Sequence, residues 1–156
     1  MLKLAKAVLI AIIILAVAGM ADSSYALKQH YSPPLESACD FNATVSCTAV
    51  NQSDDSVLLG VPVAAIGLGG YVLIGSLAAT ALFLTGRRKL LLALLLVAAL
   101  GGLGFSARLT YVELFTLNAV CPLCVLSQIL IAAITALSLV GVLKVRQPGG
   151  NPRSSE

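Results

Sequence analysis

Residues 121–143 read CPLCVLSQILIAAITALSLVGVL, a C-x-x-C pair that opens a long apolar run. At about 1.5 Å of rise per residue, a helix over residues 122–143 would cross the roughly 30 Å hydrocarbon core of a bilayer. Proline suits the first position of a helix, because the N–H that it lacks has no partner there. We therefore predict a membrane helix that begins at Pro122, with Cys121 at its N-terminal cap and Cys124 one turn further along.

Three further apolar runs are long enough to span, at residues 4–21, 61–85 and 90–109. The chain has 156 residues, is 58% hydrophobic and 11% charged, and has a mean hydropathy of +0.97. A soluble domain of this size could not cover so much apolar surface, which makes the lipid bilayer the expected solvent. We predict an all-α membrane protein with one four-helix bundle over residues 1–146. The Pro-, Gly- and Ser-rich residues 147–156 are predicted to form a disordered cytoplasmic tail.

The basic residues indicate the orientation of these spans. Only Lys28 and Arg108 fall beside the outer ends of the predicted helices, and the other eight of the ten Lys and Arg lie on the opposite side. The positive-inside rule then places both termini in the cytoplasm and the polar loop of residues 22–60 outside. The net charge of +3 follows from this topology and gives no argument for nucleic-acid binding. A second interpretation of residues 4–21 is a cleavable signal peptide, with a cleavage motif at residues 24–26.

The C-x-x-C is the better defined of two cysteine pairs. Its spacing puts the sulfurs of Cys121 and Cys124 on one helix face, within bridging distance. Free N–H groups at a helix N-terminus stabilise a thiolate and lower the pKa of a cysteine below its usual value of about 8.5. The alternatives are inert packing and a metal site. Zinc takes four ligands, and because His30, the only histidine, lies far away in the sequence, the loop and helix cysteines together would have to supply them. We predict redox chemistry and no metal.

The second pair, Cys39 and Cys47, lies in the polar loop. In a continuous helix eight residues would separate these cysteines by about 12 Å, too far for a disulfide. If they pair, the segment between them must turn back, and Asp40, Asn42 and Ser46 suit such a turn. A structural disulfide in a non-catalytic membrane scaffold is one possibility. The nearby C-x-x-C favours exchange between the pairs, so we predict a thiol–disulfide redox relay.

Three segments together resemble the vitamin K epoxide reductase family. They are C-D at 39–40 with C-x-x-V-x-x-S at 47–53, G-x-P-x-A-x-x-G at 60–67, and Y-x-E-L-F-x-x-x-A-x-C-x-x-C at 111–124. The last is similar to the bacterial branch of the family, and the resemblance covers roughly residues 37–128. The loop pair precedes the C-x-x-C, an order that disfavours the quinone-linked thiol oxidase DsbB, which carries its C-x-x-C in the first outer loop.

The resemblance implies a four-helix bundle in a bacterial inner membrane, with an extracytoplasmic loop that caps a quinone site. Cys124 would face the quinone, Cys121 would exchange with Cys39, and Cys47 would be attacked by an outside thiol protein. Ser53 matches a loop Ser/Thr thought to position the redox centre. The cofactor would be a quinone of the ubiquinone, menaquinone or vitamin K type. We expect no fused thioredoxin-like domain, so the implied partner is a separate periplasmic thioredoxin-fold protein similar to DsbA.

Several side chains near the C-x-x-C are predicted to contact the quinone. Ser127 and Gln128 follow Cys124 by three and four residues, so they project near its face. Gln128 would donate to a quinone carbonyl or hydrogen-bond within the bundle. Vertebrate relatives carry Tyr at the position of Gln128 and Asn at that of Val63. The side chain of Val63 cannot form a hydrogen bond to the substrate oxygen. We therefore favour simple quinone reduction, with vitamin K epoxide reduction as the alternative.

Three more candidates lie in residues 108–115. Arg108 would stabilise a thiolate or quinol anion, since a charge at this depth is costly, or it would snorkel to headgroups and pair with Glu113. Tyr111 and Phe115 would wall the quinone pocket or act as interfacial aromatic anchors.

Overall fold

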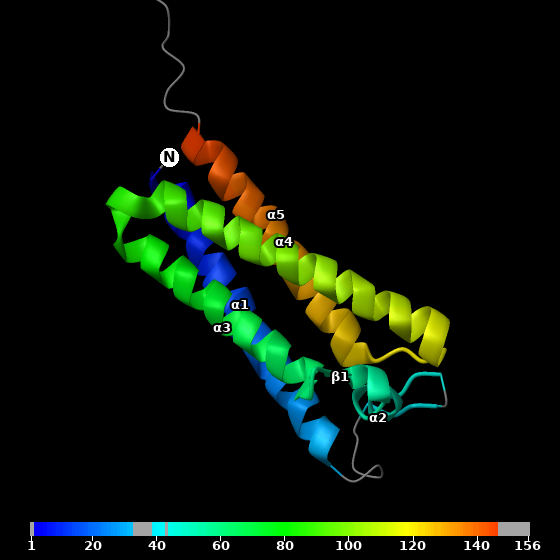
Figure 1. Ribbon diagram of the computed structural model, residues 1–156. Coiled ribbons are helices and arrows are strands. Elements are labelled where there is room, and N and C mark those ends of the chain that lie inside the picture. The colour runs from blue at the N-terminus through cyan, green and yellow to red at the C-terminus, as the bar shows by residue number, and fades with distance from the viewer. Residues whose placement is uncertain (1, 33–38, 43, 147–156) are drawn as a thin grey trace, which may run out of the picture.

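The computed structural model describes residues 2–32, 39–42 and 44–146, and the predicted tail lies outside these residues. Within them, four long helices run side by side as a bundle: α1 (Leu2–Tyr31), α3 (Val63–Phe83), α4 (Arg88–Val112) and α5 (Pro122–Arg146) (Figure 1). Each is long and apolar enough to cross a membrane. The prediction of an all-α, four-helix membrane bundle is confirmed.

Small and branched apolar side chains fill the core of the bundle. α1 contributes Leu9, Ile12 and Ala16, and these pack with Leu95 of α4 and Ile134 of α5. α1 contacts α3 most extensively and also packs against α5. The first apolar run is thus a full member of the bundle, in keeping with its interpretation as a spanning helix.

Gly19 allows an unusually close approach between α1 and α3. A Cβ added at Gly19 would overlap the ring of Tyr71, which is buried against the α1 backbone. From this position the Tyr71 hydroxyl lies 2.9 Å from the Ser127 Oγ on α5. Small residues at helix interfaces serve this kind of close packing in membranes.

Gly19→Ala is expected to destabilise the bundle by about 1–3 kcal/mol, because the ring of Tyr71 must move to admit the methyl group. The midpoint of thermal unfolding in detergent measures this effect. Gly69→Ala is the matched control, since a Cβ at Gly69 meets nothing within 4 Å. Equal stability of the two variants would contradict the packing described for Tyr71.

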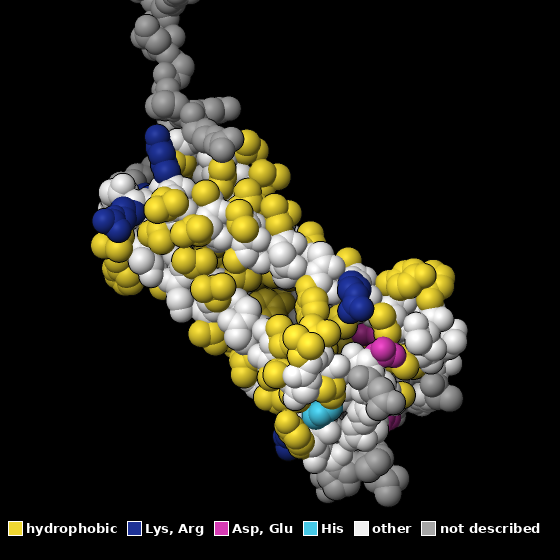
Figure 2. All heavy atoms as spheres, in the orientation of Figure 1, with side chains coloured by type: hydrophobic (Ala, Val, Ile, Leu, Met, Phe, Trp, Pro, Cys, Tyr) yellow, Lys and Arg dark blue, Asp and Glu magenta, His cyan; other side chains and the backbone are white. Residues whose placement is uncertain are grey.

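Charges separate along the bundle. The N-terminus, the end of α5 and the turn η2 (Thr85–Arg87) between α3 and α4 lie at one end, which we call the basic end (Figure 1). Lys and Arg side chains lie at this end, and Asp and Glu appear toward the opposite end, the cysteine end, where Lys or Arg side chains are also seen (Figure 2). At the basic end Arg88 is buried, and its Nε donates to the Ala81 carbonyl oxygen of α3 at 3.1 Å.

The loop predicted at residues 22–60 is shorter in the structure, because α1 continues to Tyr31. The prediction of loop for residues 22–31 was wrong because it followed polarity alone. Asp22, Ser23, Ala26 and Gln29 are buried, and their spacing is that of one helix face. The sequence carries Pro33 just after the helix, and proline cannot continue one.

Short elements cover the cysteine end. They are α2 (Cys47–Asn51), η1 (Asp54–Ser56) and an antiparallel hairpin of β1 (Val57–Leu58) and β2 (Val61–Pro62). The hairpin turn has positive φ at both central residues, 54° at Leu59 and 81° at Gly60, as a two-residue type I′ turn requires. At the same end, α4 is followed by the wide π-helical turn η3 (Glu113–Leu117), which contacts α2.

Candidate redox site

The loop between Cys39 and Cys47 turns back as the sequence predicts. The Asn42 side-chain oxygen accepts hydrogen bonds from the N–H groups of Thr44, at 2.9 Å, and Val45, at 2.8 Å. Ser46 caps α2 by accepting from the Ala49 N–H at 3.1 Å. The Cα atoms of Cys39 and Cys47 are consequently 5.7 Å apart, and the two cysteines form a disulfide.

Asp40 connects this turn to the start of α2 through hydrogen bonds. Its carboxylate accepts from the Thr48 hydroxyl at 2.6 Å, the Thr48 N–H at 3.0 Å and the Ser46 hydroxyl at 2.8 Å. The two hydrogen bonds that Thr48 donates are the main reason why the pKa of Asp40 is below its usual value. Because the ionised form is the one that accepts them, these bonds hold the turn at neutral pH and are lost only in acid.

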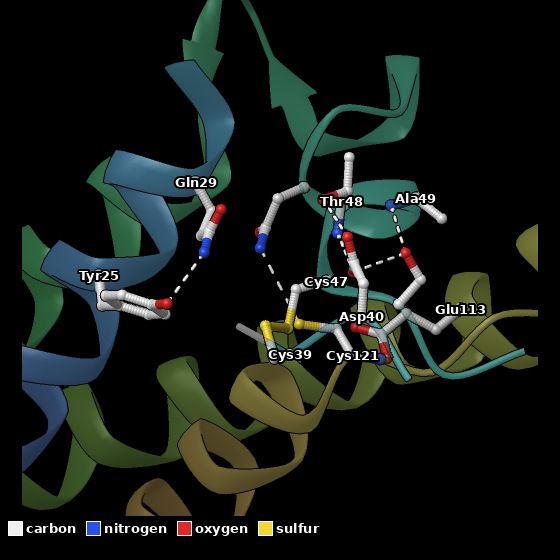
Figure 3. Close-up of a disulfide and its surroundings, with 11 residues drawn as sticks. Tyr25, Gln29, Cys39, Asp40, Cys47, Thr48, Ala49, Glu113 and Cys121 are labelled. Atoms are coloured by element: carbon white, nitrogen blue, oxygen red, sulfur yellow. Dashed lines mark hydrogen bonds between the residues drawn. A yellow bond between two sulfur atoms is a disulfide. The ribbon is translucent and has the colours of Figure 1, made fainter. Parts of the chain in front are cut away.

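A short parallel bridge between Val45 and Val120 docks the loop on the segment before α5. The Val120 N–H donates to the Thr44 carbonyl oxygen at 2.8 Å, and the Ser46 N–H donates to the Val120 carbonyl oxygen at 3.2 Å. This pairing brings the two cysteine pairs together, and the sulfurs of Cys39, Cys47 and Cys121 converge in Figure 3. Cys47 and Cys121 belong to one buried cluster, against which Cys39 and Cys124 pack.

The C-x-x-C has the geometry expected of a helix N-terminus. α5 begins at Pro122, so Cys121 directly precedes the helix, and Cys121 and Cys124 are free thiols in this structure. A hydrogen bond from the Cys124 thiol, together with the N–H groups of Cys124 and Leu123, lowers the pKa of Cys121 against the opposing effects of burial and of the nearby Glu113 charge. The side-chain amide of Asn51 in α2 also points its N–H at the Cys121 sulfur, at 3.9 Å.

The buried side chain of Glu113 contacts both cysteines of the C-x-x-C. It is 4% exposed and sits at the start of the π-helical turn that follows α4. Its carboxylate accepts from the Cys121 N–H at 3.3 Å and is in hydrogen-bonding contact with the Cys124 side chain. Glu113 therefore fixes both ends of the C-x-x-C, and no feature of its local sequence indicated that role.

The exposure of three of the four cysteines bears on the order of exchange. Cys47 and Cys121 are both 0% exposed, whereas Cys39 is only partly buried. The resemblance implied that an outside protein attacks Cys47 and that Cys39 exchanges with Cys121. In the structure Cys47 packs with Cys121, and Cys39 is the more exposed residue of the loop pair.

A cavity of about 350 Å³ lies inside the bundle near the cysteine end, lined by residues of α1, α3, α4 and α5 and by Asn51 of α2. Three predicted quinone contacts line it, namely Cys124, Ser127 and Val63. Most of the wall is apolar. Apart from Cys124 and Ser127, the polar lining residues are Asp22, Ser23, Asn51, Tyr71, Ser106 and Thr110.

Four predicted quinone contacts lie elsewhere. The Gln128 side-chain oxygen accepts a hydrogen bond from the Ser106 hydroxyl, which is the interhelical role considered as its alternative. Arg108 is exposed, and within the described residues it makes no ion pair with the buried Glu113. Tyr111 and Phe115 are exposed and pack against each other with ring centroids 4.7 Å apart, as interfacial anchors would. None of the four lines the cavity.

Ser53 lies at the end of α2. Its hydroxyl donates to the Val50 carbonyl oxygen at 2.8 Å, and its own carbonyl oxygen accepts from the Ser56 hydroxyl at 2.7 Å. Ser53 does not line the cavity. These contacts link α2, which carries Cys47, to the turn that follows it.

A comparison with curated proteins finds no match to this chain. A family model described as the vitamin K epoxide reductase family matches residues 10–139. The matched span contains both cysteine pairs, all of α3 and α4, and most of α1 and α5. The match agrees with the order of motifs in the sequence and with the four-helix bundle. The chain therefore belongs to the vitamin K epoxide reductase family of membrane oxidoreductases.

Proposed function

We propose that this protein oxidises a periplasmic thioredoxin-fold protein of the DsbA type and passes two electrons to a quinone, in support of disulfide bond formation. The observation that carries the proposal is the packing of the Cys39–Cys47 disulfide on Cys121. Cys124, three residues further on, lines an apolar cavity. A continuous path of sulfurs thus leads from the loop to a site of suitable size for a small apolar ligand.

The proposed setting is a bacterial inner membrane, with both termini in the cytoplasm and the cysteine end in the periplasm. The gathering of Lys and Arg at the basic end supports this orientation through the positive-inside rule. In the oxidising periplasm the loop disulfide can form and be renewed in each cycle.

In the proposed relay both cysteine pairs begin as disulfides. A carrier thiolate attacks Cys39 and releases Cys47, and the second carrier thiol then attacks the mixed disulfide, so that the carrier leaves oxidised. The Cys47 thiolate attacks Cys121 and releases Cys124. Cys39 then attacks Cys47, which restores the loop disulfide and leaves Cys121 and Cys124 as a dithiol.

Two features of the site suit these steps. The lowered pKa of Cys121 makes it a good leaving thiolate when Cys39 attacks Cys47, which drives electrons toward the C-x-x-C. The carboxylate of Glu113 contacts the Cys124 thiol and holds it beside the cavity. The Cys121–Cys124 dithiol then reduces the quinone, losing two electrons and two protons as it becomes a disulfide, while the quinone becomes quinol.

The cavity supports reduction of a simple quinone. Val63 stands in its wall and offers no hydrogen bond, so nothing at this position would hold an epoxide oxygen. The surface is hollowed among hydrophobic side chains between α3 and α4 (Figure 2). Ile66 and Leu73 of α3 and Gly101 of α4 line the cavity and are also exposed at the surface. We infer that the quinone reaches the cavity from the bilayer through this gap.

Gly70→Leu is expected to raise the KM for quinone by about tenfold or more, because its side chain would stand in the gap. Gly70 lines the cavity, and a Cβ there meets nothing within 4 Å, so the bundle can admit the larger residue. Gly69→Leu is the matched control, since Gly69 is exposed but does not line the cavity. Steady-state quinone reduction measures both, and an unchanged KM in Gly70→Leu would exclude this route.

The proposed function is tested by mixing purified protein in detergent with a reduced DsbA-like protein and a short-chain ubiquinone or menaquinone. Catalytic quinol formation, with matching oxidation of the carrier, is the expected result. If the protein forms no quinol and Cys39–Cys47 stays oxidised in the presence of the reduced carrier, the loop disulfide is structural. The protein would then be a non-catalytic scaffold.

A further inference from the structure

Asp22 of α1 is a buried carboxyl group in the wall of the cavity. The residue is 8% exposed, and its Oδ1 atom is fully buried with no hydrogen-bond partner among the residues that the structure describes. Its side chain makes one hydrogen bond, with the Ser127 side chain. An unpartnered carboxyl oxygen in such a place is costly, which makes a ligand partner for it the natural explanation.

The surroundings of Asp22 contain no counter-charge. No Lys, Arg or His is among the described residues that line the cavity. The titratable groups that face Asp22 are Tyr71 from α3 and Cys124 from α5, and the α4 wall contributes none. The Tyr71 hydroxyl already donates to the Ser127 carbonyl oxygen at 2.9 Å. A carboxylate here would face only neutral or acidic groups, so the cavity suits the uncharged acid.

The chemistry of the free Oδ1 atom selects the ligand. A carboxylate and a quinone carbonyl both only accept hydrogen bonds. They therefore cannot form a hydrogen bond with each other. A protonated Asp22 has an O–H to donate, and a carbonyl oxygen would satisfy it. Ser127 links Asp22 to the C-x-x-C, because it follows Cys124 by one helical turn on α5. A quinone ring in the cavity would therefore lie between the reducing sulfur and this acid.

We propose that Asp22 donates a hydrogen bond to a quinone carbonyl oxygen and transfers its proton to that oxygen as the ring is reduced. The inference rests on the proposed function. The two thiols lose two electrons and two protons as the Cys121–Cys124 disulfide forms, and the quinone gains the same number to become quinol. Asp22 gives one of these protons to the ring and is reprotonated by one that the thiols release.

Other polar groups of the wall are unsuited to this step. Ser23, Asn51, Ser106 and Thr110 can donate hydrogen bonds, but their amide and hydroxyl groups do not give up protons at neutral pH. The Ser106 hydroxyl is already bonded to Gln128. Among the described lining residues, Asp22 is the carboxylic acid.

The experiment compares wild type, Asp22→Asn and Asp22→Ala. Each protein is reduced at both cysteine pairs, freed of reductant and mixed with a short-chain ubiquinone, and quinol is followed in a single turnover across a range of pH. Asp22→Asn keeps a hydrogen-bond donor of similar shape but has no proton to transfer. We expect its quinone affinity to stay within about threefold of wild type while its rate constant falls by about 10²-fold or more.

Two further readouts separate proton transfer from a structural role. The wild-type rate constant is expected to fall at high pH, where the acid is ionised, and this decline should be absent in Asp22→Asn. Formate is expected to restore turnover in Asp22→Ala by taking the place of the missing carboxyl group. Asp55→Asn is the matched control, because it removes an exposed carboxylate at the cysteine end outside the cavity lining.

The outcomes distinguish this inference from the proposed function. A wild-type protein that forms no quinol would overturn the proposed function itself. If wild type is active and Asp22→Asn reacts at the same rate with the same pH profile, Asp22 transfers no proton and the inference is wrong. The inference is equally wrong if only the quinone affinity falls and the rate constant is unchanged, since Asp22 would then serve binding alone.

Discussion

Cys124→Ala is expected to reduce quinol formation by at least about 10³-fold, because the remaining thiol of the C-x-x-C cannot form the disulfide that supplies two electrons. The effect is best measured by quinone reduction with a reduced DsbA-like carrier. Cys124 is the cysteine that lines the cavity, so its loss removes the sulfur nearest the proposed quinone site.

The same variant has a diagnostic stoichiometry in the absence of quinone. Fully oxidised wild type holds two disulfides and is expected to oxidise two equivalents of carrier dithiol. Cys124→Ala keeps only the Cys39–Cys47 disulfide and is expected to oxidise one. If the variant oxidises no carrier, its loop is damaged and the loss of quinol formation says nothing about Cys124. Quinol formation at the wild-type rate would contradict the relay.

Replacing either loop cysteine is expected to lower carrier-driven quinol formation to the same extent, and the species that accumulate differ. Cys39→Ala leaves Cys47 next to Cys121, so a Cys47–Cys121 disulfide should persist because no Cys39 is present to resolve it. In Cys47→Ala, the remaining loop cysteine is the partly exposed Cys39. Peptide mapping by mass spectrometry after thiol blocking identifies each species.

A carrier that lacks its second cysteine sharpens this test. With the wild-type protein it should accumulate as a mixed disulfide on Cys39, the more exposed residue of the loop pair. A mixed disulfide on Cys47 would show that the loop opens before attack and would restore the order that the family resemblance implied. Accumulation on Cys121 would mean that the carrier bypasses the loop.

Much of the fold follows from local sequence. The apolar runs are separated by polar or glycine-containing segments, so the number and rough extent of the spanning helices could be predicted. Pro122 determined where α5 begins, and with it the place of Cys121 at the helix N-terminus. The turn between Cys39 and Cys47 was predictable because Asn42 and Ser46 bond to backbone groups within a few residues.

The walls of the cavity were less predictable, because they depend on how each helix is rotated about its axis. Gln128 and Ser127 are neighbours, yet Ser127 lines the cavity and Gln128 bonds to Ser106. Asp22 was assigned to the loop because it is acidic, although a helical period of buried residues continues through it. Glu113 reaches the C-x-x-C from the π-helical turn, whose presence the sequence pattern does not indicate.

The loop around Cys39 and Cys47 owes its shape to hydrogen bonds that the side chains of Asp40, Asn42 and Ser46 accept, and to the bridge between Val45 and Val120. These contacts do not depend on the bond between the sulfurs. Opening the disulfide therefore leaves the two thiols confined near each other, at an effective concentration far above that of any external thiol. In the proposed relay the loop would therefore lose and regain its crosslink in every turnover without refolding, and closure of the disulfide by its own two thiols would outcompete capture by external thiols.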